Sequence, residues 1–178
     1  MDYSNLTKPT GDTSNMGGTT QTMYWAPVDD FATLSAPTPT PTTPAERVTI
    51  SDDHVFNTGK CFKSIYLTLD KATIEALLQG DRDGKSFKNM FKGFTPGAKA
   101  DLLGFISVIK NEKFIAIIKL SDTVMIQLGS ADFYAEIAAG GFKSATNGAG
   151  TRGVEFDIES MAPDIYTYTG AVSLTPAV

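Results

Sequence analysis

His54 is the only histidine of the chain and the side chain best suited to acid–base chemistry near neutral pH. It follows Asp53, but an acid and a histidine that are adjacent in sequence do not make a catalytic triad, whose members the fold brings together. The possible nucleophiles lie outside any nucleophile-elbow motif; they are Ser51, Cys61 and Ser64. We therefore predict no catalytic residue and no enzymatic activity.

The segment GDRDGKS, Gly80 to Ser86, combines features of two ligand-binding loops without completing either. A phosphate-binding loop has four residues between its glycines, and this segment has three. A calcium loop needs an oxygen ligand at its fifth position and a Glu at its twelfth, where this chain has Lys85 and Lys92. One His and one Cys cannot supply a structural zinc site either. We predict no metal and no cofactor here, and interpret Asp83-Gly84 as the turn of a β-hairpin.

Carboxylates alternate with apolar residues in two segments of the second half. In VEFDIES, 154–160, the acidic residues are Glu155, Asp157 and Glu159, and in ADFYAEIA, 131–138, they are Asp132 and Glu136. Alternation with a period of two predicts strands that have one face on the core and an acidic face outside. Such a face could hold calcium loosely, or it could be an ordinary solvated surface. The net charge of −5 argues against a free-standing nucleic-acid binder.

The elements that carry these residues are mostly strands. We expect long β segments at 61–70, 71–80 and 86–94, a doubly covered central strand at 113–120, and further strands at 123–130, 131–138, 154–160 and 165–172. Between 138 and 154 we expect a glycine-rich loop or hairpin. The one helix expected begins with Thr95 as N-cap and Pro96 at its first position, and it ends near Asn111. The fold class predicted is mainly β, a sandwich or barrel with one flanking α-helix.

The first 46 residues differ in composition from the rest. Residues 1–20 are polar without an apolar period, and 36–44 alternate proline with other residues, which favours extended polyproline II. We divide the chain into 1–46, an arm with a short strand and a stiff linker, and 47–178, the β domain. The N-terminus has no secretory signal pattern, and the longest apolar run, 102–109, is too short to span a bilayer, so we expect no membrane partner.

Several short motifs follow one another in a fixed order. They are Gly17-Gly18 before Tyr24 and Ala26-Pro27, Gly80-Asp81, Pro96-Gly97 with Leu103-Gly104-Phe105, Asn111 before Phe114-Ile115, Leu128-Gly129-Ser130, Arg152-Gly153, and Tyr168-Thr169-Gly170. This order resembles the major tail tube proteins of long-tailed bacteriophages, from residue 17 onward. Each motif is short, so the resemblance lies in the order, and segment 36–44 has no counterpart in the family pattern.

The resemblance implies a β-sandwich protomer with a long hairpin and an extended N-terminal arm, assembling into hexameric rings that stack into a tube through which double-stranded DNA passes transiently. Further partners would be terminator, tape-measure and baseplate or tip proteins, and the location would be the virion tail, after assembly in the host cytoplasm. The hairpin tip would make inter-ring contacts through Asp81, Arg82, Asp83 and Lys85.

If the chain lines a DNA channel, we expect an acidic inner wall, because a wall that neutralised phosphates would hold the duplex in place. The candidate lumen residues are Asp132, Glu136, Glu155, Asp157 and Glu159. Lysines on the same face would cancel this charge, so we expect most of the lysines in 85–92 to serve subunit or ring contacts instead.

Two alternatives stay open. The chain could be another virion part with a small β body, such as a neck or tail-terminator ring or a capsid decoration protein. It could also be a soluble ligand-binding β-sandwich module, for which clustered exposed aromatic residues would be expected.

Overall fold

The computed structural model describes residues 1–8 and 16–178 and is mainly β, with 43% strand, 11% helix and three open sheets. The first strands are β1 (Thr19–Pro27), β2 (Phe31–Thr33), β3 (Thr49–Ile50), β4 (Val55–Phe56), β5 (Lys63–Tyr66), β6 (Thr73–Gln79) and β7 (Ser86–Pro96). The later ones are β8 (Phe114–Leu120), β9 (Met125–Leu128), β10 (Glu136–Ser144), β11 (Arg152–Ala162) and β12 (Tyr166–Tyr168). The helices are α1 (Pro44–Val48) and α2 (Ala100–Ile109), with a 3₁₀ turn, η1, at Val28–Asp30.

The largest sheet has six strands in the order β3-β12-β9-β8-β1-β5. Strand β8 lies inside it, and its residues 114–118 are fully buried, which confirms the doubly covered strand predicted from this apolar run. Strand β1 is also internal, since it pairs with both β5 and β8 and buries Met23 and Ala26 completely. Part of the N-terminal 46 residues therefore belongs to the folded core.

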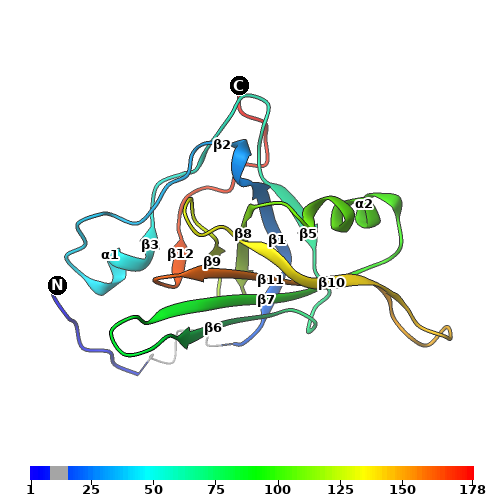
Figure 1. The fold of residues 1–178 in the computed structure, drawn as a ribbon, viewed down its shortest axis with the longest axis horizontal. Helices are drawn as coiled ribbons and strands as arrows, with labels where there is room; N and C mark the ends of the chain where they lie inside the picture. The colour runs from blue at the N-terminus through cyan, green and yellow to red at the C-terminus, as the bar shows by residue number, and fades with distance from the viewer. Residues whose placement is uncertain (9–15) are drawn as a thin grey trace.

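The second sheet has four antiparallel strands in the order β10-β11-β7-β6. Its two hairpins point in opposite directions: the β6–β7 turn lies at one end of the sheet and the β10–β11 turn at the other (Figure 1). One face of this sheet packs on the core through Phe91, Phe156 and Ile158. The opposite face carries most of the charges discussed below.

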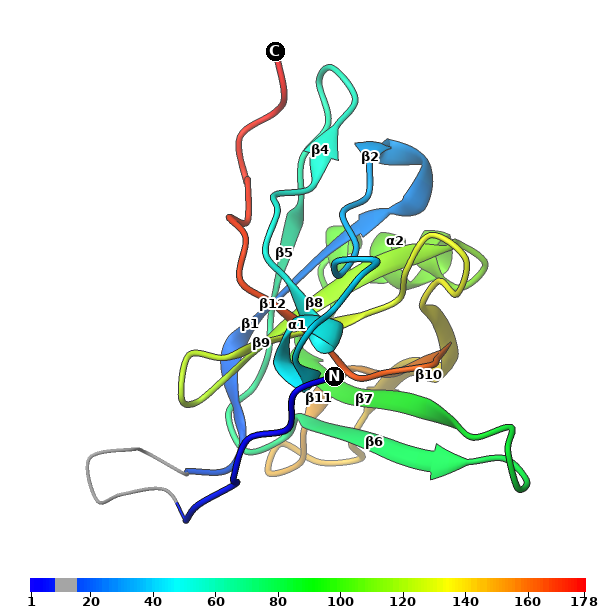
Figure 2. The same ribbon diagram turned by 90° about the vertical axis from the view of Figure 1, so that its left-hand side faces the viewer.

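Strands β2 and β4 form the small third sheet, which stands away from the four-stranded sheet beside the C-terminus (Figure 2). The C-terminal segment lies against the chain that follows β4, since Phe62 N–H donates to Ser173 O at 3.1 Å and Ala177 N–H to Lys60 O at 2.9 Å. Phe31 of β2, Phe56 of β4 and the nearby Phe62 cluster with ring centroids 4.5–5.6 Å apart.

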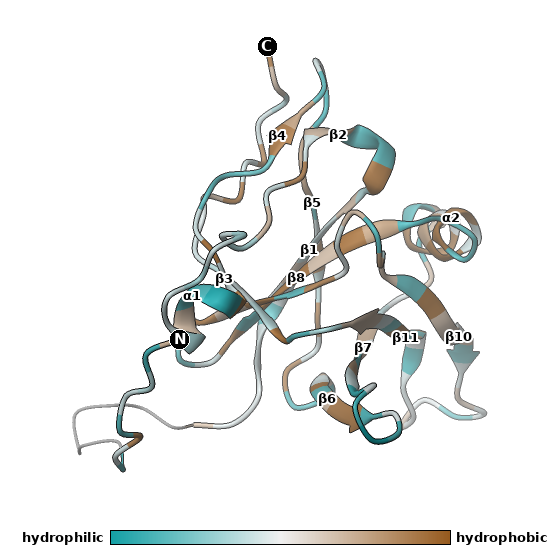
Figure 3. Cartoon of the chain, turned by 60° about the vertical axis from the view of Figure 1, so that its left-hand side comes forward, coloured by the Kyte–Doolittle hydropathy of each residue, from teal (hydrophilic) through white to brown (hydrophobic). Residues whose placement is uncertain are grey.

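The main core lies between the two larger sheets. It combines Met23 and Phe114 of the six-stranded sheet with Phe91 and Phe156 of the four-stranded one. Helix α2 closes one side of this core, because Phe105 packs edge-on against Trp25 at 5.1 Å. Figure 3 shows hydrophobic residues along β8. Strands β7, β10 and β11 carry both hydrophobic and hydrophilic residues, as expected for strands with one solvated face.

The helix prediction was wrong in two respects: α2 begins later than predicted, and the described chain has two α-helices instead of one. Thr95 and Pro96 end β7, where they pair with Val154 and Gly153, and α2 begins five residues after Thr95. Its N-cap is Lys99, whose side chain makes no capping bond. At this point the pairing with β11 determines the structure, although the local sequence favours the start of a helix.

The second helix, α1, follows directly from the Pro/Thr segment. Thr43 and Glu46 form a capping box, and Pro44 takes the first helical position, where a missing N–H costs nothing. The sequence pattern predicted extended chain up to residue 44 and did not foresee this helix.

Strand β10 also differs from the prediction. The strand expected at 131–138 begins only at Glu136 and continues through the glycines to Ser144, so the loop is confined to 145–151. The glycines permit this pairing, because a Cβ on Gly140 would lie 2.8 Å from the carbonyl oxygen of Glu155. The last strand is shorter than predicted, three residues instead of eight. Sequence and structure agree on a mainly β chain, while the described residues form three open sheets and no closed barrel or ring.

Candidate functional site

The solvent-facing side of the four-stranded sheet, called here the charged face, is the largest grouping of the residues singled out from the sequence. Directly opposite residues of antiparallel strands share a face. The register therefore collects Glu75 of β6, Lys88 and Lys92 of β7, Glu155, Asp157 and Glu159 of β11, and Glu136 and Lys143 of β10. Five carboxylates against three ammonium groups leave a formal charge of −2.

Two of the lysines on this face pair with its carboxylates. Lys88 Nζ lies 2.7 Å from Glu159 Oε2, and Lys92 Nζ lies 3.9 Å from Asp157 Oδ2. The register puts Lys92 opposite Asp157 and Lys88 opposite Met161, so both lysines lie on the same face as the acidic row of β11. The expectation that most lysines in 85–92 serve subunit or ring contacts stays a prediction. The charged face is thus partly neutralised, with acidic residues in the majority.

Four of the five acidic residues proposed for the lumen meet on this face, and the fifth does not belong to its strands. Asp132 lies in the turn between β9 and β10, where Ser130 N–H donates to Phe133 O at 2.8 Å. Sequence reasoning missed Glu75, the single carboxylate of β6, because the consecutive Leu77 and Leu78 break the alternation that marks β11.

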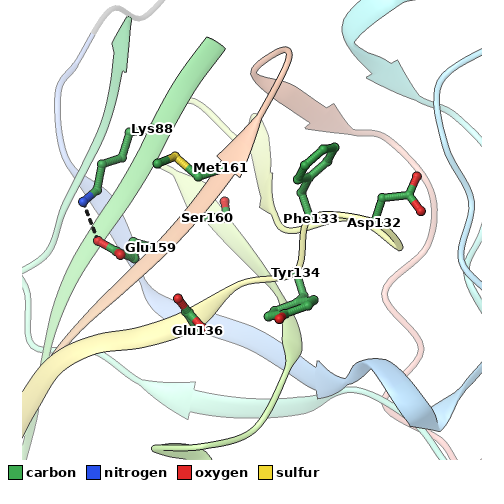
Figure 4. A pocket seen from close by; sticks show the side chains of 8 residues that line it. All are labelled: Lys88, Asp132, Phe133, Tyr134, Glu136, Glu159, Ser160 and Met161. Atoms are coloured by element: carbon green, nitrogen blue, oxygen red, sulfur yellow. Dashed lines mark ion pairs between the residues drawn. The ribbon is translucent and has the colours of Figure 1, made fainter. Parts of the chain in front are cut away.

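A pocket of about 210 Å³ opens beside the charged face, next to the start of β10 (Figure 4). It is lined by Lys88, Asp132, Phe133, Tyr134, Glu136, Glu159, Ser160 and Met161. Because β10 begins at Glu136, opposite Glu159, the next residues of β11 have no β10 partner in the ladder. The turn with Phe133 and Tyr134 bends away from that uncovered edge and forms the other wall.

The β6–β7 hairpin carries the predicted contact residues at its tip. Asp81, Arg82, Asp83 and Lys85 are all exposed, and none of them has an ion-pair partner in the described part of the chain. The hairpin itself is confirmed, with a connection of six residues between Gln79 and Ser86. Asp83 adopts the positive φ (69°) expected of the Asp-Gly turn.

Within residues 1–8 and 16–178, no further strand pairs with either edge of the four-stranded sheet. Strand β6 ends the sheet on one side and β10 on the other. Leu77 and Leu78 of β6 are 48% and 58% exposed, and Phe142 of β10 is 46% exposed. Exposed edge strands with apolar side chains are templates for pairing with another chain.

His54 is a buried structural residue in this geometry. Its Nδ1 accepts a hydrogen bond from Ser35 N–H at 3.1 Å, so the proton is on Nε2, which donates to Gln127 Oε1 at 2.8 Å. Its ring stacks on Tyr168 with centroids 4.7 Å apart. Burial lowers the pKa of His54, while the hydrogen bond to Gln127 and the charge of Asp53 act against that shift.

The possible nucleophiles Cys61, Ser51 and Ser64 make no side-chain hydrogen bond to His54 in the described part of the chain. Cys61 is buried and accepts a hydrogen bond from Lys63 Nζ at 3.4 Å, and Ser51 and Ser64 are exposed without a side-chain hydrogen bond to an acid or base in the described chain. No group of three or more His, Cys, Asp or Glu side chains that could hold a metal ion occurs among residues 1–8 and 16–178. Within the same residues, no helix combines the length and hydropathy of a membrane span.

Comparison with protein-family models, with curated proteins and with solved structures gave no significant match for this chain.

Proposed function

We propose that this chain is the protomer of a bacteriophage tail tube: a structural virion protein that assembles into stacked hexameric rings around a channel for DNA. The proposal rests on the order of motifs noted in the sequence, and one structural observation carries it furthest. The four-stranded sheet is uncovered at both edges, β6 and β10, and exposes leucines on one of them.

An open sheet of this kind is incomplete as a monomer. Pairing β6 of one copy with β10 of the next would satisfy both edges at once, and a head-to-tail contact repeated around an axis produces a ring. Closing the sheets of several copies into one barrel removes every edge. This function requires a β-sandwich protomer that forms part of a ring, which is the fold that the sequence resemblance implies.

The charged face then becomes the wall of the channel. Its acidic majority suits a surface along which DNA slides, because it neutralises few phosphates and so releases few counterions. Lys88 and Lys92 do not defeat this role, since each lies beside a carboxylate of the same face. The turn of the β6–β7 hairpin lies at one end of the four-stranded sheet (Figure 1), and its exposed charges are available for contact with a neighbouring ring.

Electron microscopy of the purified protein, negatively stained, tests the proposal. A tail tube protein should form long hollow polymers of constant width. A terminator or neck protein would give single rings, and a decoration protein or a soluble binding module would remain monomeric or form small oligomers. Either of the last two results at high protein concentration would refute the tube assignment.

A further inference from the structure

A further cavity, called here the inter-sheet pocket, lies between the two larger sheets at the end of the main core nearest the β6–β7 hairpin. Its volume is about 200 Å³, and its walls include Asn89 and the aliphatic side chains of Ile74, Ala76, Leu120, Ile126 and Ile165. We propose that this pocket binds a small uncharged molecule that combines an apolar ring with one hydroxyl group. The site goes beyond the proposed function and does not depend on it.

The core-facing row of β7 and β11 changes from apolar to polar at this end of the sheet. Phe91 and Ile158 are direct cross-strand partners in the main core, and the next pair on the same face is Asn89 with Ser160. These two residues are 3% and 4% exposed. Within residues 1–8 and 16–178, neither Asn89 Oδ1 nor Ser160 Oγ has a hydrogen-bond partner. A polar atom buried without a partner destabilises the fold, so this pair points to a ligand that supplies the partners.

Asn89 brings this polar pair to the inter-sheet pocket, because its side chain and that of Ala76, its cross-strand neighbour on β6, both line the cavity. The neighbours of Ala76 on the same face of β6 are the larger Ile74 and Leu78. The small side chain of Ala76 therefore leaves room in front of the Asn89 amide. Strand β6 is also the edge of its sheet, and no further strand of the described chain pairs with it on that side.

The walls of the inter-sheet pocket favour an uncharged ligand. Glu75 is the one ionisable residue among the described residues that line the cavity. The register places its exposed side chain on the charged face, on the other side of β6. A charged ligand would therefore lose its hydration in the pocket without gaining an ion pair, which is strongly unfavourable.

A single hydroxyl group matches both polar side chains of the pair. A hydroxyl has one donor hydrogen and two acceptor lone pairs, so it can donate to Asn89 Oδ1 and accept from the Ser160 hydroxyl. The Cβ atoms of directly opposite residues lie only about 4.5–5.5 Å apart, which one small group can bridge. A dry cavity of about 150 Å³ holds a benzene ring. The inter-sheet pocket, at about 200 Å³, therefore has room for a six-membered ring with its hydroxyl.

Fluorine NMR of 4-fluorophenol tests the site, with fluorobenzene as the probe that has the same ring and no hydroxyl. We expect saturable binding of 4-fluorophenol, about tenfold tighter than that of fluorobenzene, because only the phenol supplies partners for the buried polar pair. Equal affinity for the two probes overturns the proposal, since it would show an apolar cavity whose polar pair is satisfied by a trapped water molecule. Failure of both probes to bind overturns it as well.

Asn89→Leu removes the acceptor at nearly constant side-chain size and separates ligand binding from a structural role. It should reduce the affinity for 4-fluorophenol to that for fluorobenzene, because the hydroxyl then loses its acceptor. The urea midpoint should be unchanged or higher, because the substitution removes a buried group without a partner. A preference for 4-fluorophenol that persists in this variant would contradict the proposal.

Ala76→Leu places the ligand in the inter-sheet pocket. The larger side chain occupies the space in front of Asn89 and should abolish the binding of both probes. Leu77→Ala, at the next residue and on the opposite face of β6, is the matched control and should leave both affinities unchanged. Equal losses in these two variants would show that the probes bind elsewhere, which overturns the site. Electron micrographs of the same samples report tube formation separately, so the two proposals fail independently.

Discussion

The two ring nitrogens of His54 have fixed and different roles, and this arrangement makes the residue sensitive to pH. Protonation would place an N–H at Nδ1 facing the N–H of Ser35, so that one hydrogen bond becomes a contact between two donors. The other groups packed around the ring are Tyr168, Phe31, Phe62 and Gln127, none of them charged near neutral pH, and Asp53 is the nearby carboxylate.

We therefore expect the free energy of unfolding to fall as pH drops below about 6.5, the ordinary pKa of histidine. The folded state holds His54 neutral with a lowered pKa, so the unfolded chain binds more protons in this range and stability rises with pH. Each unit of pKa depression corresponds to about 1.4 kcal/mol. Urea titrations between pH 5 and pH 8 measure this change in the free energy of unfolding. His54→Asn keeps an acceptor for Ser35 but cannot titrate, so its profile should lack this component; identical slopes in both proteins would contradict the account.

At the residue scale, sequence alone identified His54 as unique but could not place it. Its partners Ser35 and Gln127 lie 19 and 73 residues away, and only the fold brings them together. The same limit applies to the pocket beside the charged face, which depends on where β10 begins relative to Glu159. A bulge between Ile137 and Ala139 shifts the register of β10 on β11, and no local sequence pattern predicts this bulge.

Among the elements, strand β6 offers the sharpest test of assembly. Replacing Leu78 by Lys puts a charge on an exposed edge strand, which should block pairing with another chain. The protomer should lose little stability, within about 0.5 kcal/mol, because the side chain is already 58% exposed. Tubes should be absent from micrographs of Leu78→Lys and present for Val55→Lys, a control on β4 that is 52% exposed. Normal tubes from the Leu78 variant would count against the edge contact.

Strands with a strong hydrophobic pattern of their own were predicted best from the sequence. Strands β8 and β11 were predicted well, because one is apolar throughout and the other alternates over its length. The start of α2 was missed, since Thr95-Pro96-Gly97 has the composition of a helix N-terminus while its first two residues pair with β11. The extension of β10 was missed because its glycines signal a loop, and only their pairing with β11 makes them a strand.

For the whole molecule, the acidic majority on the charged face should decide how strongly the proposed tubes bind DNA. Tubes of the unmodified protein should retain little duplex DNA even at low salt. Glu155→Lys with Asp157→Lys reverses the local charge and should produce binding that weakens steeply with salt, by a log–log slope of about −0.9 for each phosphate contacted. Asp101→Lys with Glu112→Lys, away from this face, is the control of equal charge. Filter binding at several salt concentrations measures both, and equal retention by the two variants would argue against a channel lined by the charged face.

The order of strands in the six-stranded sheet has a consequence for synthesis on the ribosome. Among the strands of the described residues, β3 pairs only with β12 in that sheet, and the paired residues Thr49 and Thr167 are 118 positions apart. Pairing between distant segments is slow, because the long intervening loop must close before the contact is made. Strand β3 of a nascent chain consequently has no partner in that sheet until residues 166–168 have emerged. A truncated product that stops short of β12 would expose Ile50 and be prone to aggregation.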